Sequence, residues 1–346
     1  MKIAYILSSL SNSGPIIVAY DLVKLMVANG HDVSVYFFDS KRDLDFPCYT
    51  QQISIKSTID FNSYDVIHCH GFRPDVFVML HKPIKCKAKI FTTIHSYIFQ
   101  DHKYAYGILK SKITSSLVLL ATFRANKIIL LSKHMLNYYK KYLPYKKLTY
   151  AYNTRDCGDA SLDSEEMSLI KSFKGTNPLL MSVSTLTQRK GLHQIISALQ
   201  YIPKYKYCIV GDGEERPRLE KLTKELNLED RVLFVGKRKA GYRFLREADV
   251  FCMPSYSEGF PLAMLEAASM GKAIVCSDIP VFREIFNDDE IVRFKIDDPK
   301  SLSEAITKAY INRKTYETNC FTKYQNNYSP LCFYKRHIEI YSCTSK

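Results

Sequence analysis

Segments typical of buried β-strands and segments typical of α-helices alternate along almost the whole chain. The helical patterns end at a glycine or just before a proline, as at Gly30 and Pro144, which are common stop signals for helices. This alternation favours parallel sheets with right-handed crossovers. Ten strands exceed a usual single sheet, so the chain is expected to form two doubly wound α/β domains. The expected strands are Lys2–Leu10, Val33–Phe38, Tyr64–Cys69, Ile90–His95 and Lys127–Ser132 in the first half, and Leu179–Ser184, Tyr207–Val210, Val232–Val235, Val250–Met253 and Ala273–Ser277 in the second.

The length and composition agree with two globular domains. At about 150 residues per domain, 346 residues suggest two, and the polar stretch 153–161 suits a linker between them. Apolar residues make up 46% and charged residues 24% of the chain, the ordinary balance of a globular protein. No apolar run reaches the roughly 18 residues of a membrane-spanning helix. The apolar start is interpreted as a first strand and not as a signal peptide.

The cysteine pattern predicts reduced thiols. Ten cysteines are scattered without any Cys-x-x-Cys pair. Four of them fall inside apolar, strand-like runs, where buried reduced thiols are more typical than disulfides or metal ligands. A cytosolic protein is therefore expected. The four cysteines are Cys69, Cys208, Cys252 and Cys276.

The net charge of +14 is concentrated in the first half of the chain. Residues 82–147 hold 14 lysines and arginines against a single acid. Such a surface suits an anionic partner (nucleic acid, an anionic bilayer or a diphosphate-bearing substrate), although coding bias would give the same excess. Residues 104–124 could form an amphipathic helix that rests on a membrane through Lys110, Lys112 and Arg124. A core helix covered by lysines would look similar, and we favour the membrane surface. No recognised nucleic-acid-binding module accompanies the basic residues, so no nucleic-acid partner is expected.

Two carboxylates, Glu258 and Glu266, flank an expected strand-to-helix junction. Glu258 follows the strand Val250–Met253, and Glu266 lies on the helix that begins near Pro261. In open α/β sheets, ligands bind beyond the carboxyl ends of the strands. Carboxylates placed there could accept hydrogen bonds from the paired hydroxyls of a polyol. A solvated surface glutamate and an ordinary helix-face glutamate are the alternative interpretation.

Other strand-to-helix loops carry features that suit an anion. Arg189 and Lys190 stand between an expected strand and the next helix, where they could neutralise a diphosphate or form a solvated basic turn. Gly14 lies in the first loop, which lacks the Gly-x-Gly-x-x-Gly spacing of a dinucleotide site. Gly211 and Gly213 flank the end of another strand, where they could admit a ligand or serve as turn glycines.

Three histidines stand at or beyond strand ends in the first half. His95 follows the strand that begins at Ile90 and is expected to line a cleft. His68 and His70 are expected to pack near the end of the sheet. None of the three has cysteines or carboxylates at the spacing of metal ligands, so no metal site is predicted.

Taken together, these motifs resemble those of glycosyltransferase family 4, which comprises retaining, nucleotide-sugar-dependent enzymes with the GT-B fold. The resemblance extends over nearly the whole chain and is most detailed over residues 179–285. It rests on the order of the segments Ser13-Gly14, Asp65-Val-Ile-His-Cys-His70, Thr93-Ile-His95, Arg189-Lys-Gly191, Gly211-Asp-Gly213 and Pro254-Ser-x-x-Glu258-Gly-Phe-Pro, with Glu266 following.

The resemblance implies two Rossmann-like domains with an interdomain cleft. The N-terminal, acceptor-side domain would comprise residues 1–155, and the C-terminal, donor-binding domain residues 156–327. A terminal helix within residues 328–346 would cross back to the first domain.

The resemblance also implies roles on the donor side. One carboxylate would hold the ribose of the donor, and another, with the backbone amides after it, would contact the transferred sugar. Two cations would bind the diphosphate and stabilise the leaving nucleotide. In that order, the residues are Glu266, then Glu258 with Gly259 and Phe260, then Arg189 with Lys190.

Further roles follow from the same resemblance. Gly14 would let the first loop approach the phosphates, Gly211 would lie close to the donor, and His95 would lie near the reacting sugar on the acceptor side. The catalytic residues would then be His95, Glu258 and Lys190. No protein nucleophile is implied, because the family favours a same-face mechanism in which the leaving phosphate helps to deprotonate the acceptor. The cations make a metal ion unnecessary, and no cofactor is expected beyond the donor substrate.

Two departures from the family pattern affect the phosphate side. The first loop has Ser13-Gly14-Pro15 where the family often has two glycines. Ser184-Thr185 stands where the family commonly carries Gly-Arg. Arg189 would have to replace the phosphate-binding arginine that is missing at Thr185.

The leading hypothesis is a hexosyltransferase that is retaining and metal-independent. It would use a nucleotide diphosphate sugar, expected to be UDP-linked, and a glycan acceptor, expected to be lipid-linked. The expected setting is the assembly of a bacterial capsule or lipopolysaccharide. Residues 82–147 would seat this cytoplasmic protein peripherally on the inner face of the plasma membrane. A same-fold sugar-nucleotide epimerase and a non-catalytic sugar-nucleotide-binding subunit are the alternatives.

Overall fold

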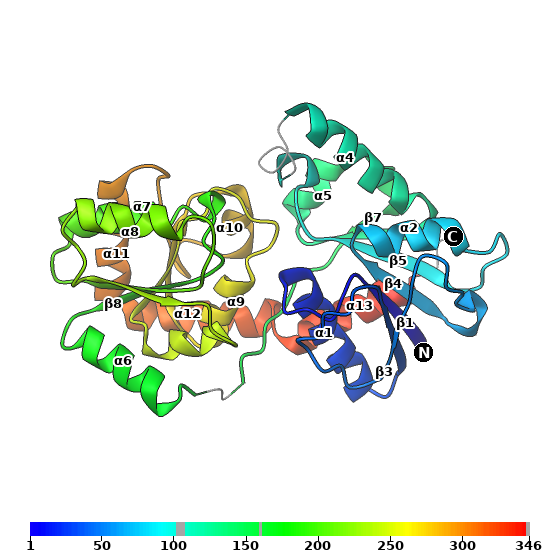
Figure 1. Cartoon of the computed structure of the whole chain (residues 1–346), viewed down its shortest axis with the longest axis horizontal. Coiled ribbons are helices and arrows are strands. Elements are labelled where there is room, and N and C mark those ends of the chain that lie inside the picture. Colours follow the sequence, from blue (N-terminus) through cyan, green and yellow to red (C-terminus); the bar gives the residue numbers. More distant parts are fainter. Residues whose placement is uncertain (102–107, 159–160, 344–346) are drawn as a thin grey trace. The chain divides into compact units, whose positions relative to one another are not determined.

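The chain folds into two compact units, each built on its own parallel sheet (Figure 1). The computed structural model describes residues 1–101, 108–158 and 161–343. The first unit comprises Met1–Thr154 together with Pro330–Lys346, and the second comprises Arg155–Ser329. The boundaries from the sequence, after residues 155 and 327, lie within two residues of these divisions.

The first unit contains a seven-stranded sheet in the order β3-β2-β1-β4-β5-β6-β7. All neighbouring strands in it are parallel. The chain winds outward from β1 to β3 and then returns to the other side of β1 to continue with β4. The order therefore reverses between β1 and β4, a position where open α/β sheets bind ligands. The strands are β1 (Lys2–Leu7), β2 (Asp32–Phe37), β3 (Tyr49–Gln52), β4 (Val66–His70), β5 (Lys89–Ile94), β6 (Lys127–Leu130) and β7 (Leu148–Tyr150).

Helices cover the sheet of the first unit because their apolar residues need burial. α1 begins at Gly14, with Pro15 in its first turn, and buries a stripe that runs from Ile16 to Met26. The C-terminal helix α13 contacts α1 and buries Phe333, His337, Ile340 and Tyr341. The expected return of the terminal helix to the first domain is confirmed. The described helices of this unit are α1 (Gly14–Ala28), α2 (Phe72–His81), α4 (Ile108–Ala121), α5 (Lys133–Tyr139) and α13 (Pro330–Ser342), with short 3₁₀ turns at Phe61–Ser63, Thr122–Arg124 and Tyr145–Lys147.

The second unit contains a six-stranded parallel sheet in the order β10-β9-β8-β11-β12-β13. Its strand order reverses between β8 and β11, in the same way as in the first unit. The strands are β8 (Leu179–Val183), β9 (Lys206–Val210), β10 (Val232–Gly236), β11 (Val250–Met253), β12 (Ala273–Ser277) and β13 (Val292–Phe294).

Both faces of this second sheet are apolar, as expected for strands covered by helices on either side. Its main core joins β8, β9 and β11 to α7 and α11 through residues such as Leu180, Ile195 and Ile306. α6 begins with a capping box, in which the Asp163 side chain accepts from the Glu166 amide. The helices are α6 (Ser164–Lys174), α7 (His193–Ala198), α8 (Arg216–Glu225), α9 (Leu262–Ser269), α10 (Pro280–Ile285), α11 (Pro299–Ile311) and α12 (Arg313–Asn327), with 3₁₀ turns at Gln188–Lys190, Leu199–Tyr201 and Gly241–Glu247.

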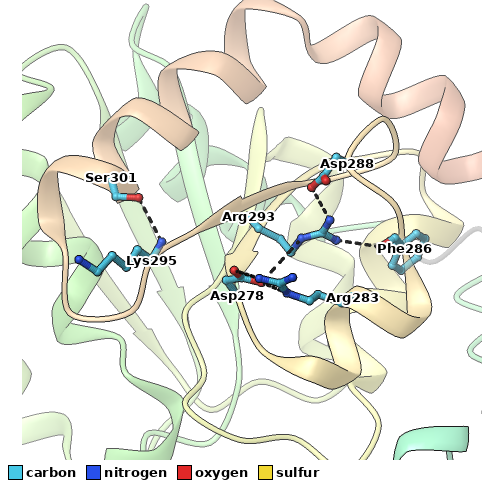
Figure 2. A network of polar contacts seen from close by, with 7 residues as sticks. All are labelled: Asp278, Arg283, Phe286, Asp288, Arg293, Lys295 and Ser301. Carbon is cyan, nitrogen blue, oxygen red and sulfur yellow. Dashed lines mark hydrogen bonds and ion pairs between the residues drawn. The ribbon is translucent and has the colours of Figure 1, made fainter.

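A polar network fastens the edge strand β13 to the elements beside it (Figure 2). Arg293, on β13, donates to the Phe286 carbonyl at 2.9 Å and pairs with Asp288. Asp278, just after β12, accepts from Arg283 of α10. Because β13 has only three residues and one strand partner, these side-chain bonds add to its few ladder hydrogen bonds.

All ten expected strands are present, with boundaries that differ by no more than a few residues. The sequence missed three strands, β3, β7 and β13, which are the shortest or most polar strands at sheet edges. Polar edge strands lack the continuous apolar run by which the central strands were recognised. The four cysteines that were predicted to be buried and reduced are buried and form no disulfide. Within the described ranges, no helix has the length and apolarity needed to cross a membrane.

Candidate functional site

The loops after β8 and β11 meet at the point where the strand order of the second sheet reverses. The Gln194 side chain donates to the Pro254 carbonyl at 2.9 Å, and the Tyr256 amide donates to the Arg189 carbonyl at 2.9 Å. Gly191 has a left-handed φ of +63°, and a Cβ there would lie 2.4 Å from the Pro254 oxygen. Only glycine allows this contact, so the Arg-Lys-Gly sequence fixes the two loops against each other.

This junction brings three predicted site residues together. The Lys190 Nζ lies 2.6 Å from the Glu258 Oε1, and the Arg189 Nη1 lies 3.5 Å from the Glu258 Oε2. Arg189 also donates to the Ser257 carbonyl. Glu258 is buried, whereas both cations keep part of their side chains exposed. The exposed part of the cluster is therefore positively charged, and the carboxylate lies buried beneath it.

The Glu258 carboxyl is held in its ionised form. Burial alone would raise its pKa, but the charges of Lys190 and Arg189 and the hydrogen bond from Lys190 lower the pKa below its ordinary value. A carboxylate that stays ionised can accept hydrogen bonds but cannot act as a proton donor. Glu258 is thus suited to orient cations and hydroxyl groups at this site.

A small cavity with a mainly apolar lining lies beside the cluster. Its volume of about 10 Å³ is near the minimum for one water molecule, and Ser184, Lys190 and Ser255 are among its lining residues. The Ser184 hydroxyl oxygen is buried and has no hydrogen-bond partner among the described residues. Buried polar atoms are normally satisfied, so this hydroxyl is an unused hydrogen-bonding group beside the cluster.

Glu266, on α9, lies in a buried ion pair that the sequence did not predict. Its Oε1 is 2.9 Å from the Nε of Arg155, and both side chains are about nine-tenths buried. The Arg155 guanidinium also lies 5.7 Å from the centroid of the Tyr242 ring, and the Arg155 carbonyl accepts from the Tyr324 hydroxyl at 2.6 Å. Arg155 lies in the stretch that was interpreted as a linker. Its positive charge was the one local signal for an ion pair, and it did not indicate the partner.

The glycines after β9 are needed for packing of the chain against itself. A Cβ on Gly211 would lie 1.8 Å from the Ser184 carbonyl oxygen, and one on Gly213 would lie 2.3 Å from the Leu186 carbonyl oxygen. The loop after β8 therefore occupies the space beside these glycines. This packing is a reason for glycine at both positions in addition to the two considered from the sequence, ligand approach and a turn.

The remaining predicted donor contacts lie in loops of both units. Phe260 is buried, with its ring 6.1 Å from that of Tyr328, and Gly259 beside it is partly exposed. Gly14 is exposed at the start of α1, just beyond the carboxyl end of β1. The first amides of a helix have no acceptors within the helix, so this end of α1 can receive an anion.

In the first unit, His95 follows β5 and is hydrogen-bonded to His70 at the end of β4. The His70 Nδ1 and the His95 Nε2 are 2.9 Å apart, so one of these nitrogens carries the shared proton. The His70 Nε2 is buried and has no hydrogen-bond partner in the described ranges. A buried N–H without an acceptor is rarer than an unused acceptor, so protonation of His70 at Nδ1 is favoured. His95 then accepts at Nε2 and carries its own proton at Nδ1.

The histidines around this pair are neutral. Burial lowers the pKa of His95 to about 3 and that of His337 to about 4, and the pKa values of His68 and His70 are also lowered by burial. His68 is fully buried between the Tyr341 hydroxyl and the Thr93 hydroxyl, each at 2.7 Å. His68 and His70 thus pack at the sheet end, as expected. In the described part of the chain, no group of three or more metal-ligating side chains is found.

Comparison with known proteins agrees with this arrangement. A family model described as Glycosyltransferase Family 4 matches residues 13–158, and one described as Glycosyl transferases group 1 matches residues 163–321. The O-antigen biosynthesis glycosyltransferase WclY of Escherichia coli is 36% identical over 352 residues, which cover 96% of this chain and 99% of WclY. The UDP-Gal:alpha-D-GlcNAc-diphosphoundecaprenol alpha-1,3-galactosyltransferase of the same species is 25% identical over 284 residues, covering 74% of this chain and 71% of the relative.

Solved structures share the fold. The HepE protein of Anabaena, crystallised with UDP, superposes with a TM-score of 0.81 at 17% identity, covering 99% of this chain and all of that chain. This similarity extends over both parallel sheets, as expected for a GT-B enzyme. With the near full-length match to WclY, the family assignment rests on the whole chain and not on single motifs. The chain therefore belongs to glycosyltransferase family 4.

Proposed function

We propose that this glycosyltransferase moves a sugar from a UDP-linked donor to a lipid-linked glycan during assembly of a bacterial surface polysaccharide. The observation that carries the proposal is the Lys190–Glu258–Arg189 cluster at the switch point of the second sheet. Two cations fixed there would bind the donor's diphosphate and stabilise the negative charge that develops as the nucleotide leaves. Because lysine and arginine supply this charge, the transfer is proposed to be metal-independent, with no cofactor beyond the donor.

Glu258 would hold the two cations in place and accept a hydrogen bond from the transferred sugar. Its position beside the Lys190 ammonium keeps it ionised, which suits acceptance from a hydroxyl and excludes proton donation at neutral pH. The backbone amides of Gly259 and Phe260 follow directly in the chain and would contact the same sugar. Arg189 would take over the role of the arginine missing at Thr185, since it occupies the same loop.

Glu266 would bind the donor's ribose, and the buried pair with Arg155 supports this assignment. An ionised carboxylate accepts hydrogen bonds from two vicinal hydroxyls, and the arginine holds it in one orientation at 2.9 Å. Gly14 would bring the first loop to the phosphates. Gly211, whose missing Cβ leaves room for the Ser184 carbonyl, would lie close to the donor.

The transfer is proposed to retain the anomeric configuration by a same-face route. A neutral His95 that carries its proton at Nδ1 would donate a hydrogen bond to the reacting sugar or the acceptor. Because its pKa is lowered to about 3, His95 would be a weak general base: it would not keep a proton taken from the acceptor. Deprotonation of the acceptor therefore falls to the leaving phosphate.

The acceptor and the setting follow from the relatives. WclY is named for O-antigen biosynthesis, and the galactosyltransferase is named for a diphosphoundecaprenol-linked acceptor. A lipid-linked glycan places the reaction at a membrane, and the basic segment 82–147 would hold the protein there by attraction to anionic lipids. The protein would then act in the cytoplasm, peripherally on the inner face of the plasma membrane, without a nucleic-acid partner.

The test is a panel of labelled nucleotide sugars incubated with the purified protein, with and without membrane extract. Release of free nucleotide only with extract, together with labelled lipid, is the expected result. Interconversion of the sugar nucleotide would instead identify an epimerase. Binding without turnover under every acceptor condition would identify a non-catalytic sugar-nucleotide-binding subunit. The anomeric configuration of the product, read by NMR, decides between retention and inversion.

A further inference from the structure

Helix α4 (Ile108–Ala121; teal in Figure 1) packs against the first unit with its polar face and turns its apolar face to solvent. Ser111 and Ser115 are buried at 4% and 0% exposure. The exposed face carries Ile113, Leu117 and Leu120, at 51–60% exposure. These positions follow i, i+4 and i+7, so they form one stripe. A helix in water normally buries such a stripe.

The apolar stripe continues into an open pocket beside the helix. Phe123, in the short turn after α4, is 72% exposed. The pocket has a volume of about 420 Å³, within the range of small-molecule sites, which is roughly 300–1,000 Å³. Its apolar lining comes from α4, the turn after it, β6 and the segments around residues 99 and 143, and includes Phe99, Leu119, Leu120, Phe123, Tyr142 and Leu143.

Lysines surround this surface, and none of them forms an ion pair with an acidic side chain in the described part of the chain. Lys147 lines the pocket and donates to the Phe123 carbonyl at 2.6 Å, and Lys82 donates to the Arg124 carbonyl at 3.0 Å. Burial lowers the pKa of both lysines, and Lys110 and Lys112 are exposed on α4 itself. Backbone carbonyls leave the charge of these lysines uncompensated, so the surface is complementary to an anionic one.

We propose that α4 lies in the interface of an anionic bilayer, with its apolar stripe among the lipid chains and one acyl chain of an anionic phospholipid in the pocket. An exposed apolar stripe bordered by lysines has the pattern of an interfacial helix. The charge around the pocket selects an anionic lipid over a neutral one, and the apolar lining selects its chain over its headgroup. The inference rests on the membrane location proposed above and names the element that enters the bilayer.

The absence of tryptophan from the sequence makes the test direct. Phe123→Trp introduces a single fluorescent reporter at the mouth of the pocket, and Ile311→Trp places one at a position with the same 72% exposure in the second unit. Both variants are mixed with phosphatidylglycerol–phosphatidylcholine vesicles whose acyl chains are brominated. We expect a blue shift and strong quenching for Phe123→Trp and neither for Ile311→Trp. Equal responses of the two reporters would overturn the proposal.

A second pair of variants separates insertion from electrostatic attraction. Leu117→Ser with Leu120→Ser should reduce flotation on these vesicles by about tenfold or more, because two leucines that enter the bilayer contribute strongly to partitioning. Leu331→Ser, at 57% exposure on α13, is the matched control and should float like the parent. At 1 M salt, where the Debye length is about 3 Å, the parent should keep part of its binding. Complete loss of parent binding at that salt would contradict chain insertion.

Two further measurements keep the proposals distinct. UDP binding by calorimetry should be unchanged in the leucine double variant, so lost vesicle binding with intact UDP binding concerns the docking surface alone. Failure of the parent to bind UDP would count against the proposed function and not against the docking surface. If the parent forms a dimer that the double variant abolishes, and the Trp at position 123 is not quenched by lipid, the stripe is covered by a second copy and the proposal is wrong.

Discussion

The carboxyl ends of the two sheets carry different polar chemistry. In the second unit, buried carboxylates pair with cations, as in Lys190–Glu258 and Arg155–Glu266. In the first unit, the same position holds neutral histidines that bind one another and nearby hydroxyls, as in His70–His95. The positive charge of the first unit lies instead in the basic segment 82–147. A fixed ion cluster suits a ligand that carries charge, whereas a neutral polar cluster suits hydroxyl groups. This difference supports the proposal that the second unit binds the donor phosphates and that the first unit faces the acceptor.

Replacement of Lys190 should have the largest effect on the charged cluster. Lys190→Met removes the ammonium that would stabilise the leaving diphosphate and leaves Glu258 buried with a weaker partner at 3.5 Å. Loss of one such electrostatic contact costs about 10²–10³ in kcat. We expect a loss of that size in the initial rate of sugar transfer, measured with the donor identified by the panel. Lys239→Ala, at an exposed lysine in the same unit, should keep the parent rate. A parent-like rate for Lys190→Met would remove the cluster from the mechanism.

Glu266 tests whether the second ion pair serves the donor or only the fold. Glu266→Ala should weaken UDP binding by about 10–100-fold, since hydrogen bonds to a charged group contribute about 1.5–3 kcal/mol. Binding of inorganic diphosphate, which lacks a ribose, should change little. Calorimetry with both ligands gives the two affinities, and Glu304→Ala, at an exposed glutamate on α11, is the control. If both ligands weaken equally, Glu266 acts through folding and the ribose assignment is wrong.

Arg155 sharpens the same question. Arg155→Met removes the 2.9 Å partner of the buried Glu266 carboxylate, and breaking one side of a buried pair costs about 3–5 kcal/mol of folding stability. The double variant Arg155→Met with Glu266→Gln removes both charges and should recover a large part of that loss, as measured by urea unfolding. UDP binding should be weak in the double variant, because Glu266→Gln leaves the ribose without an ionised partner. Recovery of stability together with tight UDP binding would contradict the assignment.

The two clusters predict pH dependences of stability in different ranges. The buried neutral histidines, whose pKa values are lowered, reduce stability as pH falls through their unfolded pKa of about 6.5, whereas the charged cluster acts at lower pH. Lys190 and Arg189 hold the pKa of Glu258 below its ordinary value of 4.5. A depressed folded-state pKa contributes stability that is fully present above the unfolded pKa and is lost as pH falls through the folded pKa. Below about pH 4.5, the free energy of unfolding should therefore fall more steeply for the parent than for Glu258→Gln. Parallel pH profiles in urea unfolding would mean that the ion pair adds no such stability.

Much of this site could be predicted from the sequence, because it follows from strand ends and local loops. Apolar runs located the ten central strands, and the order of the motifs placed Arg189, Lys190 and Glu258 at neighbouring strand ends. Arg155 could not be found in this way, since its contact with Glu266 joins residues 111 positions apart. The packing role of Gly211 likewise depends on a backbone carbonyl in another loop. Such contacts are set by tertiary structure and leave no local pattern.

Helix α4 is a second case in which the sequence predicted an element but not its tertiary contacts. The sequence predicted an amphipathic helix with lysines but left open which face would pack on the domain. Residues 104–107 of the expected segment lie outside the described residues, and α4 begins at Ile108. The structure buries Ser111 and Ser115, although hydrophobicity alone would have placed the leucines inside. The orientation of a helix depends on what its neighbours offer, and a single-sequence pattern does not contain it.

The smallest expected effect concerns the neutral cluster and the tautomer of His95. His70 donates from Nδ1, because its buried Nε2 has no acceptor among the described residues. His95 therefore presents a protonated Nδ1. His70→Asn can keep a donor near the position of Nδ1, whereas His70→Phe removes it. We expect His70→Phe to lower kcat by a few-fold, in keeping with loss of about 0.5–1.5 kcal/mol from one neutral hydrogen bond, with KM for the donor unchanged. His70→Asn should recover part of the loss.

A readout independent of turnover decides the same point. Long-range ¹H–¹⁵N correlation spectra distinguish the protonated from the unprotonated nitrogen of each imidazole. In the parent, His95 should show a protonated Nδ1 across neutral pH, because burial keeps its pKa far below that range. In His70→Phe, loss of the donor should shift His95 toward a mixture of tautomers. A protonated Nε2 on His95 in the parent would reverse the direction of the hydrogen bond, and His95 would then offer an acceptor, not a donor, to the reacting sugar.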